Sequence, residues 1–138
     1  MEKWILLGWL IILSIYDIRE KMVPIWMLTL GCCAVGSFCA YRLCMEQGVW
    51  LSMFLGIIPG VFLLVIGWLS QKTGYADGVV LLLIGVLRGY RECVVVLCVS
   101  LLLMSLVCVM LLLLRRVERN TKMPYIPFIL AAYIIVCC

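Results

Sequence analysis

The chain has 138 residues, 67% of them hydrophobic and only 13% charged, and its formal net charge is +4. A soluble domain is about half apolar and about a quarter charged, so the composition excludes an ordinary soluble protein and indicates a membrane protein. The absence of histidine excludes Ser-His-Asp and Cys-His catalysis and zinc sites built on histidine, and the scattered Lys and Arg residues give no support for nucleic-acid binding.

Six apolar segments follow one another along the chain, separated by short charged or glycine-containing breaks. The expected segments are 3–18, 25–41, 49–70, 74–90, 93–114 and 125–138. A helix that crosses a hydrocarbon core of about 30 Å needs about 20 residues, and the third and fifth segments reach that length. The sequence therefore predicts an all-α polytopic protein, a bundle of about six transmembrane helices in a single domain, residues 1–138.

The first segment lacks the small-residue pattern of a signal-peptide cleavage site, so we expect it to be retained as a span. A span of about 20 residues counted from Met1 ends at Glu20 and contains Asp17 in its last turn.

The fourth segment is harder to interpret, because it has only nine uninterrupted apolar residues, 79–87. To cross, its helix must take in residues 75–78 and extend to Tyr90, which leaves Asp77 close to the membrane surface. A re-entrant half-helix is the alternative.

The distribution of basic residues favours six crossings. One side then holds seven: Arg19, Lys21, Lys72, Arg115, Arg116, Arg119 and Lys122. The other side holds four: Lys3, Arg42, Arg88 and Arg91. The positive-inside rule places the side with seven at the cytoplasmic face and both termini outside. If the fourth segment does not cross, the split becomes five against six and the bias disappears.

The chain contains only two aspartates, Asp17 and Asp77, and six crossings bring both to the cytoplasmic face. A carboxylate at mid-bilayer costs about 3 kcal/mol, and less near an interface. Taken singly, Asp17 can be an interfacial charge that reaches the headgroups, and Asp77 the N-cap of the fourth helix.

Taken together, the two carboxyl groups can share one proton. One takes a proton from water while the other, protonated, donates to the scissile carbonyl oxygen, as in aspartic proteases. This chemistry needs neither a metal nor a cofactor, and none is expected.

Three stretches carry these acids and their surroundings: Asp17-Ile-Arg-Glu-Lys-Met-Val-Pro24, Gly74-Tyr-Ala-Asp77 and Pro124-Tyr-Ile-Pro-Phe-Ile-Leu130. In this order they resemble the motifs of the type IV prepilin (leader) peptidases, membrane aspartic proteases of the GxGD class. The resemblance covers essentially the whole chain and implies that Asp17 and Asp77 are catalytic. It implies a supporting role for the other motif residues, namely Pro24, Gly74, Ala76, Pro127 and Phe128.

Three positions depart from the family pattern. Ala76 replaces the motif glycine, Ile25 stands where the family usually has Asn, and Val79 where many members carry Lys. By analogy these positions support catalysis rather than perform it, so the departures bear on substrate range and activity level more than on the reaction.

The first loop is only the short turn 19–24, and it lacks the paired cysteines that longer family members carry. The chain thus resembles the short, peptidase-only form, which implies cleavage without N-methylation of a prepilin or pseudopilin at the cytoplasmic membrane. The nine cysteines are expected to pack as small apolar residues. Oligomeric state is not predicted.

Glu20 lies one turn beyond Asp17 and can either meet a basic residue of the leader or be an exposed glutamate with no role. Two other functions stay open. A small proton-coupled carrier requires an acid near mid-span, and a non-catalytic membrane assembly subunit requires only structural roles for both aspartates.

Overall fold

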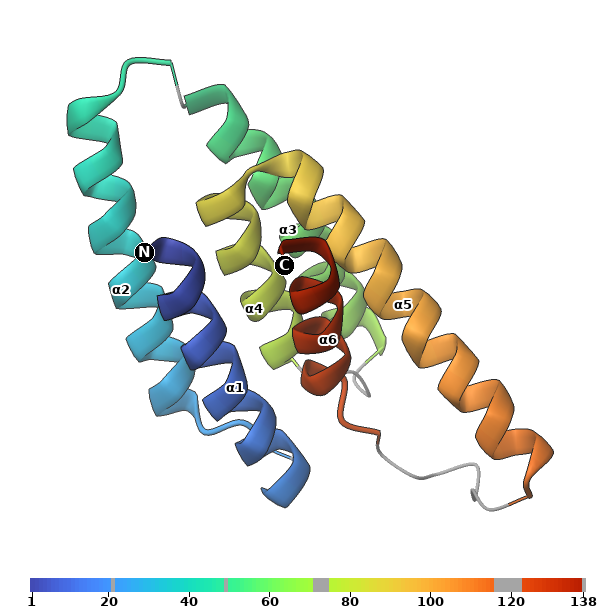
Figure 1. The fold of residues 1–138 in the computed structure, drawn as a ribbon. Helices are drawn as coiled ribbons and strands as arrows, with labels where there is room; N and C mark the ends of the chain where they lie inside the picture. The colour runs from blue at the N-terminus through green and yellow to red at the C-terminus, as the bar shows by residue number, and fades with distance from the viewer. Residues whose placement is uncertain (21, 49, 71–74, 116–122, 138) are drawn as a thin grey trace. The chain divides into compact units, whose positions relative to one another are not determined.

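The computed structural model describes residues 1–20, 22–48, 50–70, 75–115 and 123–137. Six helices and no strand occur within these ranges, which confirms the predicted all-α bundle (Figure 1). The helices are α1 (Glu2–Glu20), α2 (Ile25–Met45), α3 (Trp50–Ser70), α4 (Tyr75–Arg88), α5 (Tyr90–Leu113) and α6 (Ile126–Cys137).

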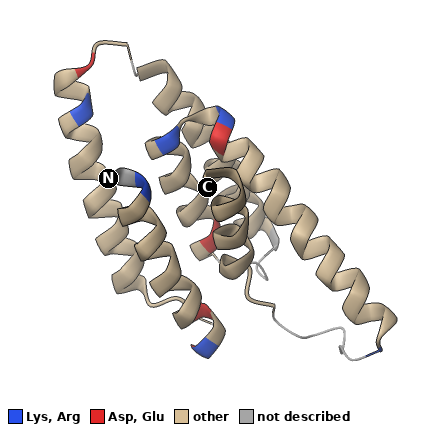
Figure 2. Cartoon of the chain, in the orientation of Figure 1, with Lys and Arg blue, Asp and Glu red and all other residues tan. Residues whose placement is uncertain are grey.

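The distribution of charge along these helices is that of a membrane protein. Every charged residue within them lies in a first or last turn, and α3 and α6 contain none (Figure 2). Helices α2, α3 and α5 are long and apolar enough to cross a membrane, yet few of their residues are buried by protein. Phe62 and Leu102, for example, are 65% and 68% exposed. Such wide apolar exposure is unfavourable in water and ordinary for a lipid-facing surface.

The chain divides into two compact units, Met1–Met22 with Val96–Cys138, and Val23–Val95. In the first unit, α1 packs against α6. Leu6, Leu10 and Leu13 are buried at a spacing of four and three residues, which places them on one face of α1. Asp17 follows Leu13 by four residues, so its carboxyl group continues this buried stripe.

In the second unit, α4 packs closely against α3 and also contacts α2. Glycines allow α3 and α4 to approach closely. A methyl group added at Gly56 would overlap the backbone of Gly85, and one added at Gly60 would overlap Leu82. Small residues four positions apart permit such a close approach of two helices in lipid.

Helix α4 has 14 residues and is about 21 Å long at 1.5 Å per residue. It ends at Arg88 because Gly89 adopts φ +89°, a left-handed conformation that ends helices readily. The expected extension of the fourth segment to Tyr90 is therefore wrong, since Tyr90 already begins α5. The Arg42 side chain donates a hydrogen bond to the Leu87 carbonyl (3.4 Å) and so satisfies an acceptor in the last turn of α4.

We expect Gly56→Ala to lower the free energy of unfolding by about 1–3 kcal/mol, because the added methyl group forces α3 away from the backbone of α4. The measurement is denaturant unfolding of the full chain in detergent micelles. Gly36→Ala in α2 is the matched control, since an added methyl group there meets no atom within 4 Å. Equal stability of the two variants would contradict glycine-mediated packing of α3 on α4.

Candidate functional site

Asp17 lies in the last turn of α1 and is only 8% exposed. Its Oδ2 atom accepts a hydrogen bond from the backbone N–H of Ile126, with a donor–acceptor distance of 3.4 Å. Ile126 is the first residue of α6, so the carboxylate faces the end of a helix where amide groups lack intrahelical acceptors. A negative charge is also favoured there by the helix dipole.

The start of α6 explains why this one amide needs an acceptor. The Tyr125 carbonyl accepts the N–H groups of Phe128 (3.0 Å) and Ile129 (3.2 Å), and Pro127 has no N–H. The Ile126 amide is the remaining donor of the first turn, and Asp17 accepts it. Pro127 and Phe128, which the sequence motif singled out, thus lie one and two residues beyond the amide bonded to Asp17. Both are half-buried.

A buried hydrogen bond next to this amide was missed by the sequence analysis. The Ser100 hydroxyl of α5 lies 2.7 Å from the Tyr125 hydroxyl, and both residues are buried. The only sequence signal was a serine inside the long apolar run of α5, a position where a hydroxyl needs a partner.

Asp77 lies in the first turn of α4 and is half-buried. The interpretation of Asp77 as the N-cap is wrong, because the helix begins two residues earlier at Tyr75. An acid in the first turn is nevertheless stabilised by the helix dipole. The neighbouring Gly78 is buried, and a methyl group added there would lie 2.8 Å from Leu64 of α3, so close packing on α3 fixes the backbone beside Asp77.

Four other residues of the first two predicted motifs are placed as follows. Ala76 is half-buried in the first turn of α4, and Gly74 lies outside the described residues. Glu20 is the exposed last residue of α1. Pro24 is half-buried and precedes α2 with φ −64° and ψ 133°, an extended conformation that suits a proline.

The two aspartates belong to different units, Asp17 to the first and Asp77 to the second. The structure therefore supplies the surroundings of each acid separately, and the pairing of the two carboxyl groups stays a prediction.

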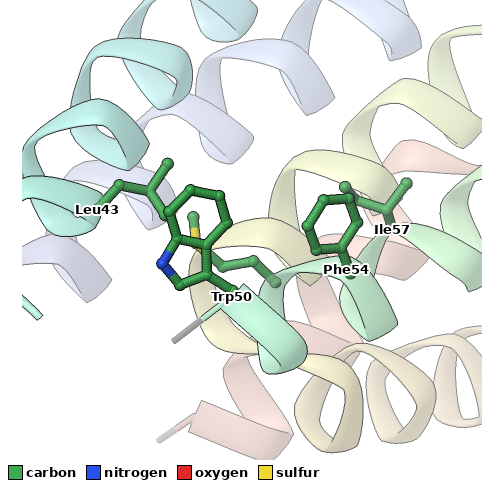
Figure 3. A pocket seen from close by; sticks show the side chains of 5 residues that line it. Leu43, Trp50, Phe54 and Ile57 are labelled. Atoms are coloured by element: carbon green, nitrogen blue, oxygen red, sulfur yellow. The ribbon is translucent and has the colours of Figure 1, made fainter. Parts of the chain in front are cut away.

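The second unit also contains a small pocket that neither aspartate lines (Figure 3). Its volume is about 160 Å³. In Figure 3 the Leu43 side chain of α2 lies beside the indole ring of Trp50. The lining residues are all apolar: Leu43, Trp50, Met53, Phe54 and Ile57. None of these five side chains is a general acid or base.

Compared with protein-family profiles, with curated proteins and with solved structures, the chain matches none of them. Nor do the described residues contain a group of three His, Cys, Asp or Glu side chains placed to hold a metal ion. Because no matching protein supplies site residues, the candidate site is defined by the two aspartates and by the contacts of each within its own unit.

We expect Asp17→Ala to destabilise the packing of α1 on α6 by about 1–3 kcal/mol, because it leaves the buried Ile126 amide without its acceptor. Asp17→Asn should cost less, since the amide oxygen of asparagine can still accept the bond. Amide hydrogen exchange along α6 measures the difference. Glu20→Ala, at an exposed position of the same turn, is the control and should leave exchange unchanged.

Proposed function

We propose that the chain is an intramembrane aspartic endopeptidase that removes the leader peptide of a prepilin-like or pseudopilin-like substrate at the cytoplasmic face of the membrane. The observation that carries the proposal is the placement of the only two aspartates. One is buried in the last turn of α1, and the other is half-buried in the first turn of α4. A buried carboxyl group in an apolar helix face is costly, and functional acids are the usual reason for one.

The proposed reaction uses the two carboxyl groups as a pair. The ionised one accepts a proton from water, and the resulting hydroxide attacks the carbonyl carbon of the scissile peptide bond. The protonated one donates to the carbonyl oxygen, which gives a tetrahedral diol intermediate. On its collapse the first carboxyl group donates the proton it took from water to the departing amine nitrogen, and a diol hydroxyl returns its proton to the second carboxylate. This releases the leader and the mature N-terminus and restores both carboxyl groups. No covalent intermediate forms, and no methyl transfer follows.

The surroundings of Asp17 suit a group with a fixed orientation. Oδ2 accepts the Ile126 N–H, and a carboxylate has a second oxygen that can bind a proton or a water molecule. A hydrogen bond from a backbone amide fixes the orientation of a carboxylate, and proton transfer requires the carboxylate to be oriented toward its partner.

The same hydrogen bond favours a second candidate, a non-catalytic membrane assembly subunit. In that protein Asp17 would only complete the first turn of α6, and Asp77 would only interact with the dipole of α4. A proton-coupled carrier has less support, because both acids lie in terminal turns rather than at mid-helix.

Cleavage of a co-expressed prepilin separates these candidates. We expect Asp17→Asn and Asp77→Asn each to abolish processing, because each removes one ionisable carboxyl group while keeping its size and an acceptor oxygen. Immunoblotting of precursor and mature forms measures processing, and Glu46→Gln is the control for loss of an exposed acid that has no place in the candidate site. Full processing by either asparagine variant would contradict the paired-carboxyl mechanism, and an inactive wild type would favour the assembly subunit.

The proposal also requires six crossings with both termini outside, so that both aspartates lie at the cytoplasmic face. We expect an alkaline phosphatase reporter fused after Gln47 or after Gly89 to be active, because both loops then face the outside. A reporter fused after Met22 should be inactive. An inactive fusion at Gly89 together with an active one at Gln47 would show that α4 turns back within the membrane.

A further inference from the structure

The hydrogen bond between Ser100 and Tyr125 has a defined direction. The Ser100 hydroxyl donates to the Leu97 carbonyl, one turn earlier in α5, at 2.9 Å. A hydroxyl group carries a single proton, so the Ser100 oxygen must accept the bond from Tyr125, and the Tyr125 hydroxyl is the donor. The result is a buried chain that runs from Tyr125 through Ser100 to the backbone of α5.

Tyr125 is thereby held at two points. Its side chain is fixed to α5 through Ser100, and its carbonyl oxygen accepts the amides of Phe128 and Ile129 at the start of α6. The next residue is Ile126, whose N–H points at the Asp17 carboxylate. Rotation of the peptide between Tyr125 and Ile126 would break the bond to Asp17, and the two anchors of Tyr125 oppose that rotation.

We propose that Tyr125, anchored by Ser100, is a positioning residue that sets the orientation of the Asp17 carboxylate through the Ile126 amide. The catalytic consequence rests on the proposed function, because it requires Asp17 to be one of the two reacting acids. The structural consequence does not, since all four residues belong to the first unit and their contacts stand without any substrate.

The chain offers a matched control within the same helix. Ser105 also donates to the carbonyl three residues earlier, Leu102, at 2.9 Å, but its hydroxyl is exposed. Ser100→Ala and Ser105→Ala therefore each remove a bond from a serine hydroxyl to the carbonyl three residues earlier in α5, and only the first also removes the hydroxyl that bonds to Tyr125. Tyr133, buried in α6 two turns beyond Ile126, provides the corresponding control for loss of a buried tyrosine hydroxyl.

The test exploits the presence of only two aspartates. Labelling with [4-¹³C]aspartate gives two carboxyl signals, and in an Asp77→Asn background the remaining signal reports on Asp17 alone. Spectra of the full chain in lipid nanodiscs at a fixed pH are compared across variants. We expect Tyr125→Phe and Ser100→Ala each to shift and broaden the signal, Ser100→Thr to restore it, and Ser105→Ala and Tyr133→Phe to leave it unchanged.

Prepilin processing by the same variants with Asp77 intact provides the second readout. We expect Tyr125→Phe and Ser100→Ala to lower kcat by about tenfold with KM changed by less than about twofold, because a misdirected carboxylate impairs the chemical step more than substrate binding.

An unchanged Asp17 signal in Tyr125→Phe would overturn the positioning role, whatever the activity. Equal shifts in the Tyr133→Phe or Ser105→Ala control would overturn it as well, because they would indicate general loosening. A shifted Asp17 signal in a wild-type protein that cleaves no prepilin would uphold the positioning role and reject the protease.

Discussion

A backbone amide or carbonyl group that lacks a partner is far more costly in hydrocarbon than in water, and this constraint governs the use of charge in the chain. At the start of α6 the Ile126 amide is satisfied by Asp17, and in the last turn of α4 the Leu87 carbonyl is satisfied by Arg42. In both cases an ionic side chain from another helix completes a helix terminus. Within the six described helices, charged residues are confined to the first and last turns.

The surroundings of the two aspartates are fixed by different means. Asp17 continues a buried leucine stripe of α1 and is oriented by a hydrogen bond. Asp77 is held through its neighbour Gly78, in a helix whose backbone approaches α3 closely because glycines remove the intervening side chains. Lipid supplies no hydrophobic force between apolar helices. Hydrogen bonds and close backbone packing are therefore the two means that fix the aspartates.

The number and class of the helices could be predicted, because each apolar segment ends at charges or at glycine. The bounds were less accurate: α2 continues past Tyr41 to Met45, and α4 stops at Arg88.

The burial of Asp17 could not be predicted, since lipid-facing positions are as apolar as buried ones and the period of 3.6 residues carries no signal in such helices. The bond between Ser100 and Tyr125 joins residues 25 positions apart, and only the packing of the chain reveals it. The family resemblance drew attention to Pro127 and Phe128, whereas the residues that connect α6 to Asp17 are Tyr125 and Ile126.

The glycine contact between α3 and α4 has a consequence for biosynthesis. Helix α4 is short and carries an acid in its first turn. On its own, its transfer from the insertion machinery into the lipid bilayer is therefore only weakly favourable in free energy. Helix α3 is synthesised first, and its Gly56 and Gly60 are the positions against which the backbone of α4 packs. The two helices can therefore partition together as one hairpin, with α3 supplying the apolar surface that α4 lacks. In the proposed six-span topology, membrane integration of α4 depends on its partner helix as much as on its own hydropathy.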